Sequence, residues 1–330
     1  MKKVFKIFGY LILIIVVAVG ALLTYVKTAL PDVGAAEDLK FEYTPERIER
    51  GRYLAHSVNV CMDCHATRDW SKFSGPPTPG TLGKGGDRFD QSVGMPGVYH
   101  AKNITPFGIS RYSDGELYRV ITTGVTKEGN ALFPIMPYPY YGRMDAEDVY
   151  SVIAYIRTLS PVESTVPDAQ HDFPFNFIVN TIPQKAEPQK RPEKTDLLAY
   201  GAYMANASGC VECHTPVEKG QIVKELAYSG GRDFAFPDGS VLRSSNITPD
   251  NETGIGTWTQ ETFIQKFKIY ADSAYRIPTV APGEFNTIMP WTMYAGMERD
   301  DLAAIYAYLK TMPARKNTVV KYTPAAKWVL

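Results

Sequence analysis

All four cysteines of this 330-residue chain fall in two copies of one pattern, CMDCH at 61–65 and CVECH at 210–214. Each copy places two thiols one helical turn apart and a histidine directly after them. The thiols can then form thioethers with the two vinyl groups of one porphyrin while the imidazole faces the iron. One copy is expected by chance about 10⁻³ times at this composition, so two copies indicate two covalently bound haem c groups.

The predicted haem attachment residues are Cys61, Cys64, Cys210 and Cys213, and the predicted proximal iron ligands are His65 and His214. Two other uses of paired cysteines fit poorly. The two pairs of a zinc ribbon usually lie ~15–20 residues apart, whereas here the first cysteines of the pairs are 149 residues apart. A thioredoxin-type redox pair needs a βαβ setting, which this sequence does not predict.

Methionine is the usual second axial ligand of cytochrome c iron, and it raises the reduction potential. Met136 and Met289 occupy the same position of a repeat, each inside Ile-Met-Pro, and are the predicted ligands. The proline removes a backbone donor and stiffens the loop that presents the thioether. Met144 and Met297 also align with each other, but they lie just before a helix, where a core methionine fits better.

The sequence similarity between the two copies extends well beyond the pentapeptides. Four blocks recur in one order, which indicates a duplicated domain of about 115 residues. The first copy has one extra residue in the block that ends at CxxCH, and the last block aligns without gaps. The blocks are GRYLAHSVNVCMDCH (51–65) with GAYMANASGCVECH (201–214), GGDRF (85–89) with GGRDF (230–234), NITP at 103–106 and 246–249, and 135–159 with 288–312.

Each copy is expected to be mainly helical. Thr44 and Pro45 form an N-cap and first position that open a helix through Leu54. Asp145 opens the last helix, whose apolar residues recur at helical spacing. Gly51 and its counterpart on the first helix should let the last helix cross closely. Residues 66–100 and 215–245 are rich in Gly, Pro and Ser and are expected to be loops held by something inside the domain.

The N-terminus carries an apolar segment, Ile7–Val26, with twenty residues and no charge. A helix of that length spans roughly 30 Å, the thickness of a bilayer core. Three lysines precede it, which predicts that they stay in the cytoplasm and that the remainder is exported. A cleaved signal peptide is the alternative, although its apolar core is usually only ~7–15 residues long. Either way, residues 31–330 lie outside the cytoplasm.

Composition and charge exclude several classes of protein. Hydrophobic residues make up 45% and charged residues 21%, which excludes a disordered chain and a polytopic membrane protein. The net charge of zero combines a basic first 30 residues with a remainder of formal charge −4, and no basic face suggests nucleic-acid binding. His56, His100 and His171 have no counterpart in the other copy and are expected to be non-ligating. Arg88 and Arg232 could pair with haem propionates or be solvated.

The predicted organisation has six parts. Proline at 161, 167, 174, 183, 188 and 192 predicts an extended connector without helix or central strand. FPFNFIV (173–179), within it, is too apolar to float in water and should lie against one or both domains. The parts are a membrane anchor (1–30), a tether (31–42), domain one (43–160), the connector (161–194), domain two (195–315) and a C-terminal tail (316–330).

Gly-x-Tyr before CxxCH, then NITP, then Met-Pro and a Tyr-rich last helix resemble the cytochrome c subunits of bacterial membrane-bound alcohol, gluconate and aldehyde dehydrogenases. SSNITPDNETGIGTWTQETF (244–263) and FPFN in the connector carry the strongest likeness, which covers about 250 residues. The resemblance implies two tandem class I cytochrome c folds, haems ligated by His65 with Met136 and by His214 with Met289, and electron relay from a dehydrogenase. Members of that family carry three haem motifs, whereas this chain has two.

The predicted function is electron transfer by a dihaem cytochrome tethered to the bacterial inner membrane by one helix. Its haem domains would face the periplasm, take electrons from a dehydrogenase or quinol-oxidising complex and pass them to a cytochrome or terminal oxidase. The alternative is an enzyme, a dihaem peroxidase, which needs one iron with an open distal site. Met-Pro in both copies argues against that site. A role as a subunit of a respiratory complex is compatible with electron transfer.

Overall fold

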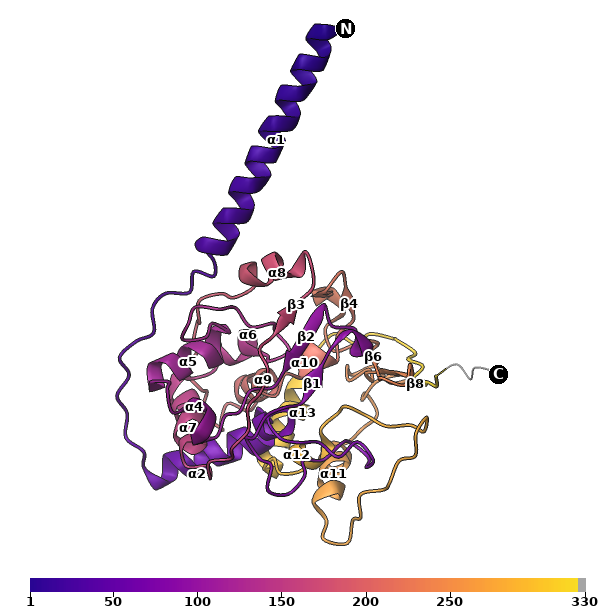
Figure 1. Cartoon of the computed structure of the whole chain (residues 1–330). Coiled ribbons are helices and arrows are strands. Elements are labelled where there is room, and N and C mark those ends of the chain that lie inside the picture. Colours follow the sequence, from indigo (N-terminus) through magenta and orange to yellow (C-terminus); the bar gives the residue numbers. More distant parts are fainter. Residues whose placement is uncertain (326–330) are drawn as a thin grey trace.

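The computed structural model describes residues 1–325, which form a long N-terminal helix and a mainly helical body. Helix α1 (Lys2–Thr28) projects from the body, and no residue along it is buried (Figure 1). It is the one helix among the described residues that is long and apolar enough to cross a membrane. The predicted N-terminal apolar helix is therefore present, and residues 29–44 lead from it to the body without regular structure.

The body contains two segments with a similar order of elements, which we call the first repeat (residues 44–171) and the second repeat (residues 196–323). The first repeat has α2 (Pro45–Tyr53), α3 (Cys61–Cys64), α4 (Pro106–Ile109), α5 (Asp114–Thr123), α6 (Tyr138–Tyr141) and α7 (Ala146–Arg157). The second repeat has α9 (Leu197–Ala207), α10 (Cys210–Cys213), α11 (Gln260–Lys268), α12 (Trp291–Tyr294) and α13 (Arg299–Leu309). Short 3₁₀ turns lie at 91–93, 179–181, 224–226 and 269–271.

The predicted helix starts of the first repeat are confirmed. The Thr44 hydroxyl accepts a hydrogen bond from the Arg47 amide at 3.2 Å, and Pro45 takes the first helical position of α2. Asp145 accepts one from the Glu147 amide at 3.0 Å at the start of α7. These caps pair backbone donors that the first turn of a helix leaves free.

The first and last helices of each repeat cross at a glycine, as expected. A Cβ added to Gly51 would lie 1.8 Å from the Ser151 carbonyl oxygen and 2.8 Å from Tyr155 Cβ. A Cβ added to Gly201 would lie 2.0 Å from the Ala304 carbonyl oxygen and 3.0 Å from Tyr308 Cβ. Any side chain at either position would push the helices apart, so the glycines set how closely they pack.

The extra residue of the first copy is absorbed in a π-helical turn, Leu54–Val58, between α2 and α3. There the Asn59 amide donates to the Leu54 carbonyl five residues back, at 2.8 Å. A π-turn inserts one residue into a helix without changing what lies on either side. Gly51 and Cys61 therefore keep the same structural relation as Gly201 and Cys210, although the sequence between them is longer.

The two stretches expected to be loops contain short strands, which corrects that expectation. In the first repeat β1 (Arg88–Phe89), β2 (Gly97–His100) and β3 (Gln170–His171) form an antiparallel sheet in that order. In the second, β6 (Asp233–Ala235), β7 (Val241–Arg243) and β8 (Tyr322–Thr323) do the same, and β4 (Val217–Glu218) pairs with β5 (Gln221–Ile222). The strands have two to four residues, too few for a period-2 pattern to be visible in the sequence.

The connector is not free of helix, and this also corrects the sequence prediction. Helix α8 (Phe175–Ile178) and the 3₁₀ turn Val179–Thr181 begin directly after Pro174, where proline no longer blocks the helix. The 173–179 segment does lie against the body, because Val179 is buried and the Phe175 ring lies 5.2 Å from that of Phe133. The strand in this region, β3, is an edge strand.

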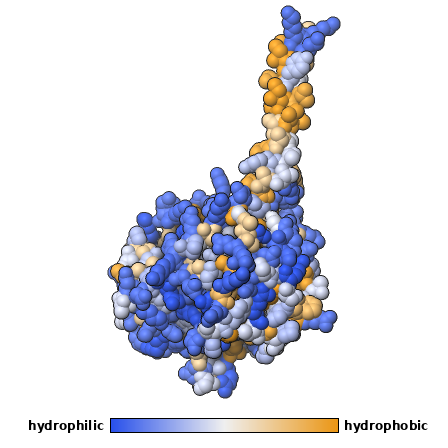
Figure 2. Space-filling view, turned by 90° about the vertical axis from the view of Figure 1, so that its left-hand side faces the viewer, coloured by the Kyte–Doolittle hydropathy of each residue, from blue (hydrophilic) through white to orange (hydrophobic). Residues whose placement is uncertain are grey.

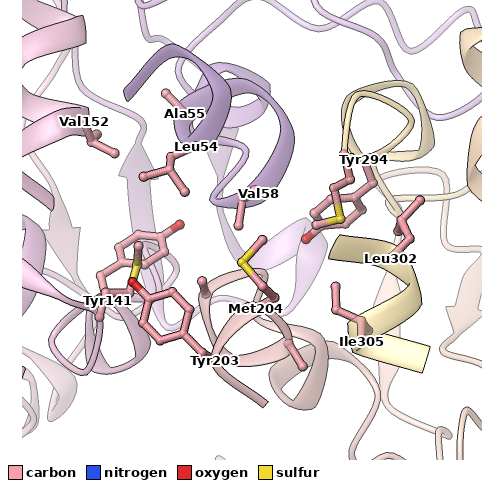
Figure 3. Close-up of a cluster of buried hydrophobic side chains, with 14 of the residues drawn as sticks. Leu54, Ala55, Val58, Tyr141, Val152, Tyr203, Met204, Tyr294, Leu302 and Ile305 are labelled. Atoms are coloured by element: carbon pink, nitrogen blue, oxygen red, sulfur yellow. The ribbon is translucent and has the colours of Figure 1, made fainter. Parts of the chain in front are cut away.

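The two repeats share one hydrophobic core. Buried side chains from the π-turn, α7, α9, α12 and α13 form a single cluster, with Val58 and Met204 near its centre (Figure 3), and Ile48 and Tyr53 of α2 pack against it. Both side chains are fully buried. The repeats are therefore packed against each other as one body and are not separate domains joined only by the connector.

Reciprocal hydrogen bonds link the repeats at the edge of this core. The Tyr53 hydroxyl donates to Asp301 Oδ2 at 2.6 Å, and the equivalent Tyr203 hydroxyl donates to Asp148 Oδ2 at 2.7 Å. Each hydroxyl also accepts a hydrogen bond from a backbone amide of the other repeat. The Glu298 amide donates to Tyr53, and the Asp145 amide donates to Tyr203. Both tyrosines come from the Gly-x-Tyr sequence that precedes each CxxCH motif. They join the repeats about an approximate twofold axis.

Candidate haem-binding sites

Each CxxCH motif forms a single helical turn that starts from a residue in the left-handed region. Gly209 has φ +63° before α10, and the equivalent Val60 has φ +47° before α3. The four cysteines are free thiols. Burial raises the pKa of the Cys61 and Cys210 thiols to about 12 and that of Cys213 to about 11. The thiols are thus neutral, which suits bonding to apolar vinyl groups better than holding a metal ion as thiolates.

The two predicted proximal histidines are held in the same way. His65 Nδ1 lies 2.6 Å from the Lys102 carbonyl oxygen, and His214 Nδ1 lies 2.7 Å from the Ser245 carbonyl oxygen. A carbonyl can only accept, so Nδ1 carries the proton and Nε2 keeps its lone pair for a metal. Burial lowers the pKa of both imidazoles, which favours the neutral form that an iron ligand needs.

The NITP blocks position those carbonyl groups. Asn103 Oδ1 accepts from the Thr105 amide and hydroxyl at 2.9 and 2.7 Å, directly after Lys102. Asn246 Oδ1 does the same with Thr248, directly after Ser245. Each asparagine amide group also donates to the chain that follows the last helix, at the Val162 and Arg315 carbonyls. Recurrence of the block marked these residues in the sequence, but only the structure assigns their role in orienting the histidines.

The Gly-Gly turns close the back of each site. The Gly85 amide donates to the His65 carbonyl, and the Gly230 amide donates to the His214 carbonyl, at 3.1 and 2.8 Å. Both glycines have positive φ, and a Cβ on either would approach the backbone before NITP to within 2.4–2.7 Å. Only glycine fits there, so the backbone of 85–86 and of 230–231 supports the segment that holds the histidine.

Met136 and Met289 lie in matching turns at the edge of the core. Each is partly buried, precedes the proline that opens α6 or α12, and has its carbonyl bonded to the amide two residues on, at 2.7 and 2.8 Å. Met144 and Met297 are only 2% exposed, and the Met144 sulfur accepts a hydrogen bond from Asn59 at 3.2 Å. The rival pair thus has the environment of core methionines.

The turn that presents Met289 is held by the other repeat. The Ser74 hydroxyl donates to the Met289 carbonyl at 2.6 Å and accepts from the Trp291 amide at 3.1 Å. In the other direction, the Tyr140 hydroxyl, four residues after Met136, donates to Glu212 of the CVECH motif at 2.7 Å. Each candidate site is therefore built partly from residues of the other repeat, a feature that no pattern within one copy reveals.

Both motifs carry an acidic residue paired with an arginine. Asp63 lies 3.2 Å from Arg68, whose guanidinium is buried and stacks on Trp70, and Glu212 pairs with Arg232. Burial raises the pKa of Asp63 to about 6. Arg232 is thus engaged by the motif itself. Arg68 has no counterpart at the same position of the second copy, so the repeat pattern does not mark it as a site residue.

The unmatched polar residues lie away from these turns or are already bonded. The His56 ring lies 2.6 Å from the Tyr155 hydroxyl, and the His171 ring lies 3.1 Å from the Tyr99 hydroxyl. His100 lies on β2 opposite Arg88. The Arg88 side chain is largely exposed and pairs with Asp90. Among residues 1–325, no group of three or more His, Cys, Asp and Glu side chains is arranged to hold a metal ion. The donor set of two thiols, one imidazole and one thioether per site instead fits haem c.

Replacing Met289 by leucine should lower the reduction potential of the second haem without releasing it. Leucine fills similar space but cannot bind iron, and loss of a thioether ligand lowers the potential. The weak red-edge absorption band of methionine–iron ligation should fall by about half if both sites contribute equally. Met297→Leu is the matched control, since its side chain is buried in the core. An unchanged spectrum for Met289→Leu would show that another residue is the ligand.

Comparison with known proteins shows which family part of the chain resembles. Residues 198–313, which lie within the second repeat, match the family model described as cytochrome c. Covalently bound haem c is the cofactor of that family. The match agrees with the prediction that the chain is a c-type cytochrome.

The relatives confirm the predicted resemblance to dehydrogenase subunits. The chain is 26% identical over 296 residues to the gluconate 2-dehydrogenase cytochrome c subunit of Pantoea cypripedii, covering 84% of this chain and 62% of that protein. It is 30% identical over 284 residues to the fructose dehydrogenase cytochrome subunit of Gluconobacter japonicus, covering 82% and 54%. It is 27% identical over 269 residues to a dihaem c-type cytochrome of Cereibacter sphaeroides, covering 77% and 82%. The chain spans 54–62% of the length of the gluconate, alcohol and fructose dehydrogenase cytochrome subunits that it matches.

Proposed function

We propose that this chain is a membrane-tethered dihaem c-type cytochrome that passes single electrons between redox proteins outside the cytoplasm. The observation that carries the proposal is the duplicated histidine geometry. Two imidazoles, each directly after a pair of thiols, donate Nδ1–H to the carbonyl before an NITP block and keep Nε2 free. The haem iron, when bound, supplies the one-electron chemistry.

The proposed sites are one per repeat, in two tandem class I cytochrome c domains close to residues 43–160 and 195–315. Cys61 and Cys64 would hold the first haem between His65 and Met136. Cys210 and Cys213 would hold the second between His214 and Met289. The short sheets extend each repeat beyond these bounds. Strand β3, from the connector, completes the sheet of the first repeat, and β8, from the C-terminal tail, completes that of the second. Residues 326–330 of that tail lie outside the described part of the chain.

The chain's own residues would control these haems in three ways. The carbonyl bonds orient each imidazole and fix its tautomer. The proline turns would present a thioether to each iron and so leave no open position for peroxide. The shared core and the reciprocal tyrosine hydrogen bonds hold the two sites in one rigid body. Electron transfer between the sites would then need no movement of one repeat relative to the other.

The proposed location is the inner membrane of a bacterium, with one pass by α1 and the haem domains on the periplasmic side. Twenty uncharged residues in α1 match the bilayer core, and Lys2, Lys3 and Lys6 would remain cytoplasmic. The relatives named as dehydrogenase subunits favour a dehydrogenase or quinol-oxidising complex as donor. A cytochrome or terminal oxidase would be the acceptor.

A spectroscopic redox titration of the full chain, expressed with haem-attachment machinery, tests the proposal. We expect two haems per chain by haemochromogen assay, both low-spin, with positive potentials and the red-edge methionine band. One high-spin or strongly negative haem would contradict the ligation by Met136 and Met289. Hydrogen-peroxide turnover by such a species would then favour the peroxidase alternative.

A further inference from the structure

The connector presents exposed apolar side chains beside the end of α1. Phe173 is 82% exposed and Ile178 is 44% exposed, on either end of α8. Phe173 is the most exposed large apolar side chain of the described body, whereas Ile178 is about as exposed as several others there, and the body surface in view is mostly hydrophilic (Figure 2). Exposed apolar side chains that lie together, as these do on either side of one short helix, are typical of a contact with a partner or a membrane.

Helix α1 and α8 are in contact. The last turns of α1 pack against α8 and the following 3₁₀ turn, and there Leu23, Val26 and Leu30 are partly covered while the preceding residues are exposed (Figure 1). The Lys27 ammonium lies 5.3 Å from the centre of the Phe177 ring. The position of α8 relative to α1 is therefore set by direct packing.

That packing fixes the depth of α8 relative to a bilayer. The uncharged run of α1 ends at Val26, so the outer boundary of the hydrocarbon core lies at this turn if α1 spans the membrane. Tyr25 and Lys27 are residue types that favour this interface, the one through its amphipathic ring and the other by extending its ammonium to the headgroups. Helix α8 touches the same turn and must lie at the same level.

We propose that α8 and Phe173 form a second membrane contact, in which Phe173 and Ile178 enter the headgroup–acyl boundary of the outer leaflet. Phe175 and Val179 point the other way and hold the segment to the body, through the Phe133 ring and the core. The segment thus has one apolar side that faces the body and another that would face the lipid. The occupant is lipid, because the surface continues directly from the membrane-spanning helix.

The contact fixes the orientation of the electron-transfer body. The last turns of α1 pack against α8, so the body already sits close to the outer end of the membrane-spanning helix. A second contact at α8, which follows β3 of the first repeat, would hold that repeat toward the bilayer. A quinol-oxidising or membrane-bound donor would then always meet the same face of the protein. The inference rests on the proposed spanning by α1.

Spin-label accessibility in the haem-loaded full chain tests the contact. Phe173→Cys and Ile178→Cys, each labelled with a nitroxide, are placed in vesicles of phosphatidylethanolamine and phosphatidylglycerol with the haem irons reduced. The native cysteines are occupied by haem thioethers, so only the new thiol reacts. Collision of the label with oxygen reports lipid, and collision with a water-soluble nickel chelate reports water.

Two reference positions make the outcome decisive. Phe107→Cys replaces another exposed phenylalanine, on α4 away from α1 (47% exposed), and Ile14→Cys lies in the middle of α1. We expect the ratio of oxygen to nickel collisions at 173 and 178 to be several-fold above that at 107 and to approach that at 14. Ratios at 173 and 178 equal to that at 107, with 14 in lipid, would overturn the second contact alone. A water-like ratio at 14 would overturn the anchor and the contact together.

Discussion

Replacing Cys210 and Cys213 together by alanine should reduce the haem content from two per chain to one and unfold most of the second repeat. The reason is that the proposed haem would complete the apolar core of the second repeat at this edge. Cys210, Met289 and Met293 are only partly buried and line the edge of the core. Without the group that they enclose, that edge would be open to water, and loss of this much buried apolar area exceeds the stability of a small domain.

Haemochromogen assay and limited proteolysis measure the two parts of this prediction. Val211→Ala is the matched control, because it alters the same turn but keeps both thiols and His214. The mirror variant, Cys61 and Cys64 to alanine, should also leave one haem per chain. A double variant that keeps two haems would refute the attachment sites. A protease-resistant second repeat without haem would refute the role of haem in its core.

Replacing Asp301 by alanine should lower the free energy of unfolding by about 3–5 kcal/mol. The Asp301 side chain is fully buried and accepts from Tyr53 at 2.6 Å, Tyr200 at 3.0 Å and Lys194 at 3.0 Å. Burial and the Asp301 carboxylate raise the pKa of Tyr200 to about 12, so its hydroxyl stays protonated and donates. Alanine would leave two buried hydroxyl donors without an acceptor and cut one of the links between the repeats.

Urea unfolding followed through the haem absorption of each repeat measures this effect. The equivalent Asp148→Ala should behave similarly, because Tyr203, Arg50 and Arg191 all bond to that carboxylate. Glu252→Ala, which removes a surface pair with Lys316, should change the free energy by no more than about 0.5 kcal/mol. An Asp301→Ala protein as stable as Glu252→Ala would show that the reciprocal bonds do not hold the repeats together.

Local chemistry and the internal repeat were readable in the sequence. CxxCH needs only five consecutive residues, so the predicted attachment does not depend on the fold. The N-caps at Thr44 and Asp145 and the close crossings at Gly51 and Gly201 were also predictable, since each depends on a few residues of one helix pair. The strands at 88–100 and 233–243 were not, because strands of two to four residues have no period to detect.

The amino-acid sequence by itself determined the kind of cofactor chemistry, the duplication and the apolar N-terminal helix, because each is written in a short pattern or a repeated one. The tertiary structure alone decided how the two halves meet. Tyr53 bonds Asp301 across 248 positions of the chain, and Ser74 supports Met289 across 215. Such contacts depend on where packing brings distant segments together, so no spacing within either copy encodes them. The placement of α8 beside α1 has the same origin.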